Sequence, residues 1–111
     1  MHELGITRNI VSIVSEKAQG RRVRRVTLEI GKLSAIEPQA VAFCFDVCSQ
    51  GTALEGAALE IREIEGRGRC RNCGAEQALD SLPQACACGS RRFERLAGEE
   101  LNIKEMELEV A

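Results

Sequence analysis

Residues 21–33, RRVRRVTLEIGKL, carry the pattern around which the rest of the chain can be organised. Val26, Leu28 and Ile30 alternate with polar residues, so their side chains fall on one face of an extended backbone. We therefore predict a β-strand with one buried face, whose regular part ends near Gly31. The segments on either side of this strand must supply the apolar side chains that cover the buried face.

Two amphipathic helices are predicted, one before and one after this strand. Apolar residues between Leu4 and Ala18 recur every three or four positions, which is typical of a helix, and Gly20 is expected to end it. Residues 37–51, EPQAVAFCFDVCSQG, begin with a proline suited to a first helical turn and end at a glycine. The apolar face of this second helix is expected to hold Val41, Cys44, Val47 and Cys48.

Two further strands are predicted later in the chain. In residues 57–66, AALEIREIEG, apolar and charged residues alternate, which indicates a second half-buried strand. Residues 99–110, EELNIKEMELEV, alternate as well, but the apolar positions change parity at Lys104 and Glu105. Because side chains on a strand alternate strictly between its two faces, this change predicts a β-bulge within one long strand.

Two close cysteine pairs lie in residues 70–90, CRNCGAEQALDSLPQACACGS. Cys70-x2-Cys73 and Cys86-x-Cys88 are separated by twelve residues, and each pair is followed by a glycine that permits a tight turn. Four thiolates satisfy the tetrahedral preference of Zn(II) and leave no open coordination position, so we predict a structural zinc site. A redox dithiol and an iron–sulfur cluster are the alternative uses of these thiols.

Together these elements predict an α+β fold, in which a three-stranded sheet carries two helices on one face and a zinc-ribbon subdomain is inserted before the last strand. Residues 1–65 together with residues 96–111 form the expected α+β domain, and residues 66–95 form the four-cysteine insert. The insert should not fold without its metal, because its apolar residues are few. They are essentially Leu79, Leu82 and Phe93.

Composition excludes several classes of protein. A chain of 111 residues, with 44% hydrophobic and 29% charged residues, is one ordinary domain or one small domain with a stapled subdomain. Its apolar runs fall short of the roughly 18 residues that span a bilayer, and its first ten residues do not have the pattern of a secretory signal. We therefore expect a soluble, cytoplasmic protein without membrane partners, whose six cysteines serve as metal ligands or core residues instead of disulfides.

Two features of the cysteines and arginines have a structural and a functional interpretation. Cys44 and Cys48 could present two thiols from one helix to a metal, but their apolar neighbours favour a core position.

The insert carries arginine at positions 67, 69, 71, 91, 92 and 95. These arginines exceed the acids of residues 66–95 by three, and the −2 charge of a tetrathiolate zinc centre leaves a surplus of only +1. Charge compensation at the surface is therefore favoured over nucleic-acid binding.

The N-terminus offers an unusual set of metal donors. His2 is the single histidine of the chain, and a histidine at a chain end is by default a solvated residue. However, the terminal amine of Met1, the imidazole of His2 and the amides of His2 and Glu3 can place four nitrogens in one plane. Planar nitrogen donors suit Ni(II) or Cu(II) and not zinc. Such a site requires Met1 to remain in place with its amine unblocked.

An N-terminal Met-His-Glu, a strand that ends in IGKLSAIEP, the helix motif AFCFD, a four-cysteine ribbon and a closing acidic strand together resemble the HypA/HybF family of hydrogenase nickel-incorporation proteins. The resemblance implies that His2 is the nickel ligand, with Met1 and Glu3 around it. It also implies four zinc ligands: Cys70, Cys73, Cys86 and Cys88. Many members have Cys-Pro-x-Cys where this chain has Cys-Ala-Cys, a departure that concerns the local geometry of the second pair.

The function implied by the resemblance is that of a metallochaperone without catalytic activity. Structural zinc stays in place, whereas nickel is cargo that passes to the large subunit of nickel–iron hydrogenase during maturation. The implied partners are the HypB GTPase and the hydrogenase large subunit, with urease accessory proteins for some members, and we expect a monomer or a weak homodimer. The alternatives are a zinc-ribbon module that binds nucleic acid, and a structural adaptor in which zinc only stabilises an interaction surface and no nickel binds.

Overall fold

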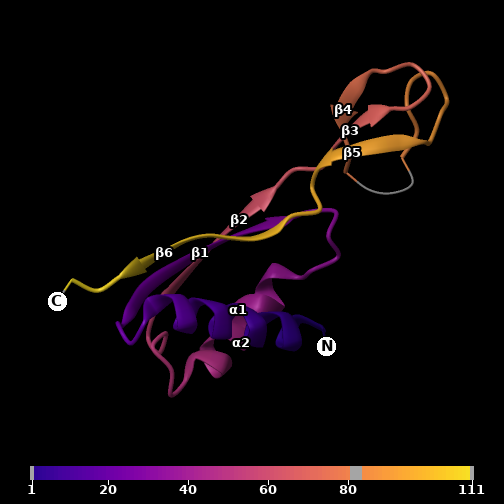
Figure 1. Cartoon of the computed structure of the whole chain (residues 1–111). Helices are drawn as coiled ribbons and strands as arrows, with labels where there is room; N and C mark the ends of the chain where they lie inside the picture. The colour runs from indigo at the N-terminus through magenta and orange to yellow at the C-terminus, as the bar shows by residue number, and fades with distance from the viewer. Residues whose placement is uncertain (1, 81–83, 111) are drawn as a thin grey trace.

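A three-stranded sheet with two helices on one face forms the larger part of the molecule (Figure 1). The computed structural model describes residues 2–80 and 84–110. The central strand β1 (Val23–Gly31) pairs in parallel with β2 (Ala58–Ile64) and antiparallel with β6 (Leu101–Leu108). The helices α1 (His2–Ala18) and α2 (Pro38–Ser49) cover one face of this sheet (Figure 1). The predicted α+β fold class is confirmed.

The core lies between the helices and the predicted buried face of β1. Val26, Leu28 and Ile30 are at most 1% exposed and pack against buried residues of both helices. On the opposite face Thr27 is also buried, although a solvated polar position was expected there. Thr27 lies on the central strand, so long side chains of both neighbouring strands stand beside it. Arginine and glutamate side chains of β1, β2 and β6 line a hollow around Thr27 and shield it from solvent.

The bulge predicted in the last strand is present. Thr27 of β1 pairs with Glu105, and the next residue, Leu28, pairs with Ile103. Lys104 therefore has no partner of its own in this ladder, and its ammonium lies 3.7 Å from the carboxylate of Glu29. The extra residue keeps Ile103 on the core side of the sheet, which is why the apolar pattern changes parity at this point.

The buried face of α2 differs from the one that was expected. Val41 and Phe45 are buried and Cys48 packs against the core, whereas Val47 is 53% exposed. Cys44 is only half-buried and lies outside the core cluster. Apolar residues surround almost the whole of α2, so their spacing alone does not select one face; the bulky Phe45, four residues after Val41, occupies the position that points at the sheet.

A second, smaller sheet projects from one end of the first (Figure 1). It is antiparallel and consists of β3 (Arg67–Cys70), β4 (Glu76–Ala78) and β5 (Phe93–Ala97), in the order β4-β3-β5. Its buried apolar residues, apart from the cysteines, amount to Leu79 among the residues described. Leu82, expected to contribute as well, lies outside the described residues.

Glycines allow the two sheets to join closely. A side chain on Gly31 would lie 2.0 Å from the carbonyl oxygen of Gly98, and one on Gly66 would lie 2.3 Å from that of Leu79. The amide of Leu33 donates to the carbonyl of Gly98 at 2.7 Å, so the segment after β1 is bound to the base of the ribbon.

Neither helix is long and apolar enough to cross a membrane, as far as the described residues go.

Candidate metal centres

The four cysteines of the insert converge on one point. The Sγ atoms of Cys70, Cys73, Cys86 and Cys88 all lie within 4.8 Å of one another. Two of the separations are 3.6 Å, from Cys70 to Cys88, and 3.7 Å, from Cys73 to Cys86. Four sulfurs at about 2.3 Å from a tetrahedral Zn(II) would be about 3.8 Å apart, so the cluster fits zinc in both number and spacing.

The first cysteine pair sits in a turn that directs backbone amides at a thiolate. The amide of Gly74 donates to the carbonyl of Cys70 at 2.9 Å, and Gly74 has a φ of +81° that suits a glycine. This turn brings the amides of Asn72 and Cys73 to 3.4 and 3.5 Å from Cys70 Sγ. Amide donors stabilise the anionic sulfur that zinc requires.

The second pair has one residue fewer, and its turn is shorter by the same amount. Here the amide of Gly89 donates to the carbonyl of Cys86 at 2.8 Å, three residues back, whereas the first turn closes over four. Gly89 has a φ of +94°, so glycine again meets a requirement of the backbone. The Cys-Ala-Cys spacing is thus accommodated by a tighter turn, and all four sulfurs still reach one site.

The electrostatics of the cluster favour a bound cation. The amide of Cys73 lowers the pKa of the Cys70 thiol to about 6, and the Asn72 amide acts in the same direction. The side-chain amide of Asn72 lowers the pKa of Cys88. At Cys86 the Cys88 amide favours the thiolate, but burial and the neighbouring thiols prevail and raise its pKa to about 11. The Cys86 thiol therefore keeps its proton at neutral pH unless a metal such as Zn(II) displaces it.

Asn72 was not singled out by the sequence analysis. Its side-chain amide lies 3.5 Å from Cys88 Sγ, so it connects the turn of the first pair to a cysteine of the second. The signal available in the sequence was a short polar residue between the cysteines of the first pair, which is too common in turns to identify a partner.

At the other candidate site, His2 is the first described residue and the first residue of α1. Its side chain is 62% exposed, and its Nε2 lies 3.4 Å from a carboxylate oxygen of Glu3. Met1, which was expected to supply the terminal amine, lies outside the described residues. The histidine therefore belongs to an ordered helix and is accessible to a metal ion from solvent.

Glu3 is buried at the junction of the two helices. Its carboxylate accepts a hydrogen bond from the Glu37 amide at 3.1 Å, at the residue that caps α2. This hydrogen bond is the main cause that lowers the pKa of Glu3 to about 2; the amide of Glu3 itself and the nearby His2 act in the same direction. The carbonyl of Glu3 accepts a 2.6 Å hydrogen bond from the buried Thr7 hydroxyl. The start of α1 is therefore held against the loop before α2.

The two candidate centres are separate in the structure. The start of α1 belongs to the helical layer of the core, whereas the cysteine cluster lies in the ribbon (Figure 1). Within the residues described, the cysteine cluster is the one group of at least three His, Cys, Asp or Glu side chains arranged to hold a metal. Cys44 and Cys48 are not part of it.

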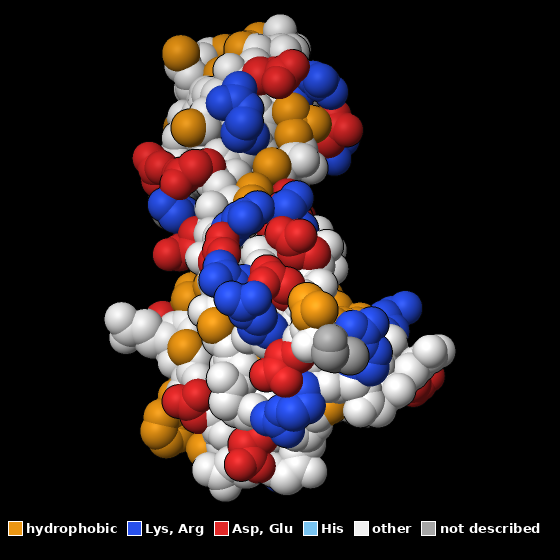
Figure 2. Space-filling model, turned by 90° about the vertical axis from the view of Figure 1, so that its left-hand side faces the viewer, with side chains coloured by type: hydrophobic (Ala, Val, Ile, Leu, Met, Phe, Trp, Pro, Cys, Tyr) orange, Lys and Arg blue, Asp and Glu red, His pale blue; other side chains and the backbone are white. Residues whose placement is uncertain are grey.

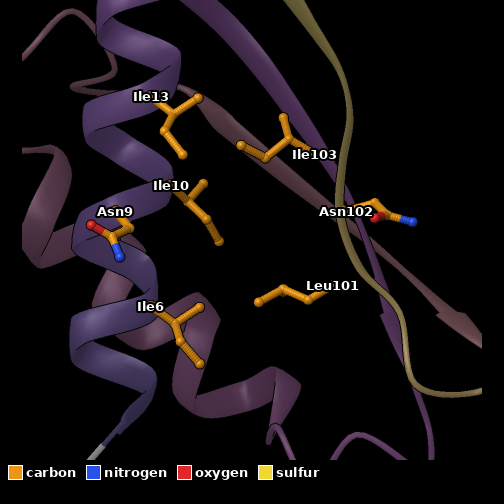
Figure 3. A pocket seen from close by; sticks show the side chains of 7 residues that line it. All are labelled: Ile6, Asn9, Ile10, Ile13, Leu101, Asn102 and Ile103. Carbon is orange, nitrogen blue, oxygen red and sulfur yellow. The ribbon is translucent and has the colours of Figure 1, made fainter.

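An apolar hollow of about 450 Å³ between α1 and β6 offers no metal ligands (Figure 3). Ile6, Ile10 and Ile13 of α1 face Leu101 and Ile103 of β6 across it, whereas Asn102 points away (Figure 3). Its walls carry no thiol, imidazole or carboxylate.

Comparison with known protein families gives a consistent picture. A family model described as hydrogenase/urease nickel incorporation, metallochaperone, hypA matches residues 1–108. A hydrogenase maturation factor HypA from a Nostoc species is 65% identical over 109 residues, which are 98% of this chain and 96% of that protein. The hydrogenase maturation factor HypA of Geobacter sulfurreducens is 47% identical over 110 residues, covering 98% of this chain and 100% of that protein.

Two solved structures share the fold. The solution structure of the Ni metallochaperone HypA from Helicobacter pylori has a TM-score of 0.67 at 20% identity, with 96% of both chains covered. A solution structure described as HypA protein has a TM-score of 0.70 at 23% identity, with 97% of this chain and 96% of that chain covered. At these identities the likeness concerns the arrangement of helices, sheet and ribbon.

Proposed function

This chain belongs to the HypA family of hydrogenase/urease nickel incorporation metallochaperones, and from that premise we propose that it binds Ni(II) at its N-terminus and delivers the ion to the large subunit of nickel–iron hydrogenase. The observation that carries the proposal is the position of His2: an exposed imidazole at the first turn of α1, beside a carboxylate that is held in place by α2.

We propose four nitrogen donors: the terminal amine of Met1, the amides of His2 and Glu3, and the imidazole of His2. Residues at the start of a helix have amides outside the intrahelical ladder, so the amides of His2 and Glu3 do not have to leave it to bind a metal. The Glu3 amide would exchange its own carboxylate for the metal. Of the two imidazole nitrogens, Nδ1 is the one that can close a small chelate ring with the amide of the same residue. It would do so from outside the plane, and not in the common plane expected from the sequence, because the amine and the Glu3 amide take the two in-plane positions beside the His2 amide. Nε2 is then left to face Glu3, as it does at 3.4 Å.

Glu3 would then act mainly by orientation. Its carboxylate is engaged by the Glu37 amide and lies next to His2 Nε2, an arrangement that fixes the tautomer and direction of a ligating histidine. We therefore assign the amide of Glu3 to the metal and its carboxylate to the support of His2. Glu37 has its carboxylate at the α2 N-cap, where it accepts from the Gln39 amide.

Charge balance supports deprotonated amides at this position. The N-terminus of a helix carries a partial positive charge, which disfavours a bare divalent cation and favours amide anions. Two deprotonated amides would neutralise Ni(II), and the amine and imidazole would add no charge. A neutral complex is therefore compatible with the start of a helix, and coordination by nitrogen donors that include deprotonated amides suits nickel better than zinc.

The ribbon would keep zinc as a permanent structural ion. We propose Cys70, Cys73, Cys86 and Cys88 as its ligands, since all four sulfurs converge and a tetrathiolate site leaves no position for cargo. The two metals are then sorted by ligand type, thiolates for zinc and terminal nitrogens for nickel.

The partners proposed for this function are the HypB GTPase and the hydrogenase large subunit, with urease accessory proteins as further candidates. We place the protein in the cytoplasm and assign it no catalytic step. Transfer of nickel in one direction would then depend on the partner GTPase, because exchange of a metal between binding sites does not by itself have a direction.

Nickel titration of the zinc-loaded protein tests the proposal. We expect one tight nickel site in the wild type, and the loss of this site both in His2→Ala and in a form with one extra residue before Met1. Zinc should remain at about one ion per chain in all three, because the tetrathiolate site is closed. Unchanged nickel affinity in the extended form would refute coordination by the terminal amine.

Two control variants separate the sites. Cys44→Ala combined with Cys48→Ala removes both thiols outside the ribbon and should leave nickel and zinc binding unchanged. Cys73→Ala should release zinc and unfold the ribbon while the helices and the first sheet persist. Retention of full zinc in Cys73→Ala would contradict the four-cysteine assignment.

A further inference from the structure

The six arginines of the ribbon fall into two groups. Three of them, near the base of the second sheet, form ion pairs with glutamates: Arg67 with Glu76, Arg69 with Glu76 and Glu94, and Arg95 with Glu99. The other three, Arg71, Arg91 and Arg92, are exposed, and their guanidinium groups make no hydrogen bond or ion pair with any residue that the structure describes. The unpaired positive charge of the ribbon is therefore gathered next to the cysteine pairs.

Two of these arginines border a polar hollow of about 420 Å³, whose walls are Arg71, Asn72, Ser90 and Arg92. The Arg71 amide donates to the Arg92 carbonyl at 2.9 Å, which holds the two chain segments side by side. The hollow is therefore bordered by one arginine from each segment, and Asn72 and Ser90 complete its walls.

The walls of the hollow are attached to the cysteine turns. Asn72 lies between Cys70 and Cys73 and donates to Cys88 Sγ at 3.5 Å. The Ser90 carbonyl accepts from the Cys86 amide at 2.8 Å, and the Ser90 hydroxyl accepts from the Arg92 amide at 3.2 Å. Because each cysteine turn supplies one wall, an ion that fixes the four sulfurs also fixes the spacing of Arg71 and Arg92.

We propose that this hollow, at the tip of the ribbon, is a docking site for an acidic segment of a partner protein, and that zinc holds it in its binding form. A guanidinium group presents a planar fork of donors that matches a carboxylate. The two forks, with Asn72 and Ser90 between them, fit two neighbouring carboxylates of one chain segment. The proposal does not depend on nickel binding at the start of α1, so either can fail without the other.

Carboxylates fit the hollow better than a polynucleotide does. Binding of DNA or RNA relies on many phosphate contacts and, for single strands, on exposed aromatic side chains. Phe93, the one aromatic residue of the ribbon, is half-buried and packs against Gly68. Positive and negative side chains are interleaved over the face shown in Figure 2, which offers no continuous positive track. The chain also has a net charge of −2.

The test follows amide NMR signals of the zinc-loaded full chain during titration with a hexaglutamate peptide at low ionic strength. We expect saturable shifts at Arg71, Asn72, Ser90 and Arg92. The double variant Arg71→Gln/Arg92→Gln should bind the peptide about tenfold more weakly, which corresponds to two exposed charge pairs. A matched control, Arg67→Gln/Arg95→Gln, changes the net charge equally but removes paired arginines, and should bind like the wild type.

Several results would overturn the proposal. Equal weakening in both double variants would mean that the peptide senses only net charge. If a single-stranded dodecanucleotide bound the same residues more tightly than hexaglutamate, the tip would be a nucleic-acid site. If an equal concentration of inorganic phosphate displaced the peptide, the hollow would be a general anion site. Unshifted signals at the tip would refute it directly. Zinc content measured on each variant confirms that the ribbon is intact.

Discussion

The tighter turn of the second cysteine pair predicts a measurable dependence of zinc affinity on one glycine. Gly89 has a φ of +94°, and a methyl group built on its Cα meets no atom within 4 Å. The substitution Gly89→Ala therefore introduces no clash, and its effect comes from the backbone conformation alone. Residues other than glycine lose about 1–2 kcal/mol in left-handed conformations.

This energy should appear almost entirely in metal binding. The Gly89 amide closes the turn onto Cys86 at 2.8 Å, and the ribbon has little apolar core with which to hold that turn in the absence of an ion. Folding of the turn and zinc binding are then one equilibrium, so a loss of about 1–2 kcal/mol weakens zinc affinity by about 5- to 30-fold.

Competition with a chromophoric zinc chelator at neutral pH measures the effect. Gly5→Ala is a matched control, because its added methyl group also meets nothing within 4 Å but lies in helix α1. It should leave zinc affinity unchanged and stabilise the fold by about 0.5–1 kcal/mol. Gly89→Asn should recover part of the loss, since asparagine tolerates left-handed backbone better than alanine. Wild-type zinc affinity in Gly89→Ala would refute the reasoning.

Two further predictions concern the core and the start of α1. Phe45→Ala should destabilise the fold by about 3–5 kcal/mol, because Phe45 is 2% exposed. Phe43→Ala should change the stability by less than about 0.5 kcal/mol, because Phe43 is 73% exposed. Urea denaturation measures both variants, and similar losses of stability would contradict the observed buried face of α2. The pKa of Glu3, about 2, lies below its ordinary value of 4.5, so the ionised carboxylate stabilises the fold above that ordinary value and this contribution is lost as pH falls through about 2. Thermal unfolding should therefore separate Glu3→Gln from wild type near neutral pH and converge toward pH 2; a constant difference would contradict the Glu3–Glu37 contact.

Predictions from the sequence succeeded where the pattern was local and unambiguous. The alternation in β1 and the parity change at Lys104 identified the buried face of the sheet and the bulge, because each depends on neighbouring residues alone. The spacing of the cysteines identified the cluster for the same reason. On α2 the same approach chose Val47 in place of Phe45, because apolar residues on several sides of a helix leave its orientation to the sheet beneath it.

Contacts between distant residues account for what the sequence did not reveal. Glu3 and Glu37 are 34 positions apart, and no repeat or motif indicates that the carboxylate of one receives the amide of the other. The separation of paired from unpaired arginines in the ribbon likewise depends on which glutamates the strands place beside them.

By itself the amino-acid sequence determined the order of the two helices and of the three strands of the larger sheet, the parity of that sheet, the four thiols of the ribbon and the solitary histidine beside the chain terminus, since these follow from residue types at fixed spacing. It did not predict the three strands of the ribbon. Tertiary structure alone decided that Glu3 is held by the α2 cap next to His2, that Phe45 faces the core, and that Arg71 and Arg92 share one hollow. The physical reason is that burial and charge pairing depend on distances through space, which packing sets only when the whole chain has folded.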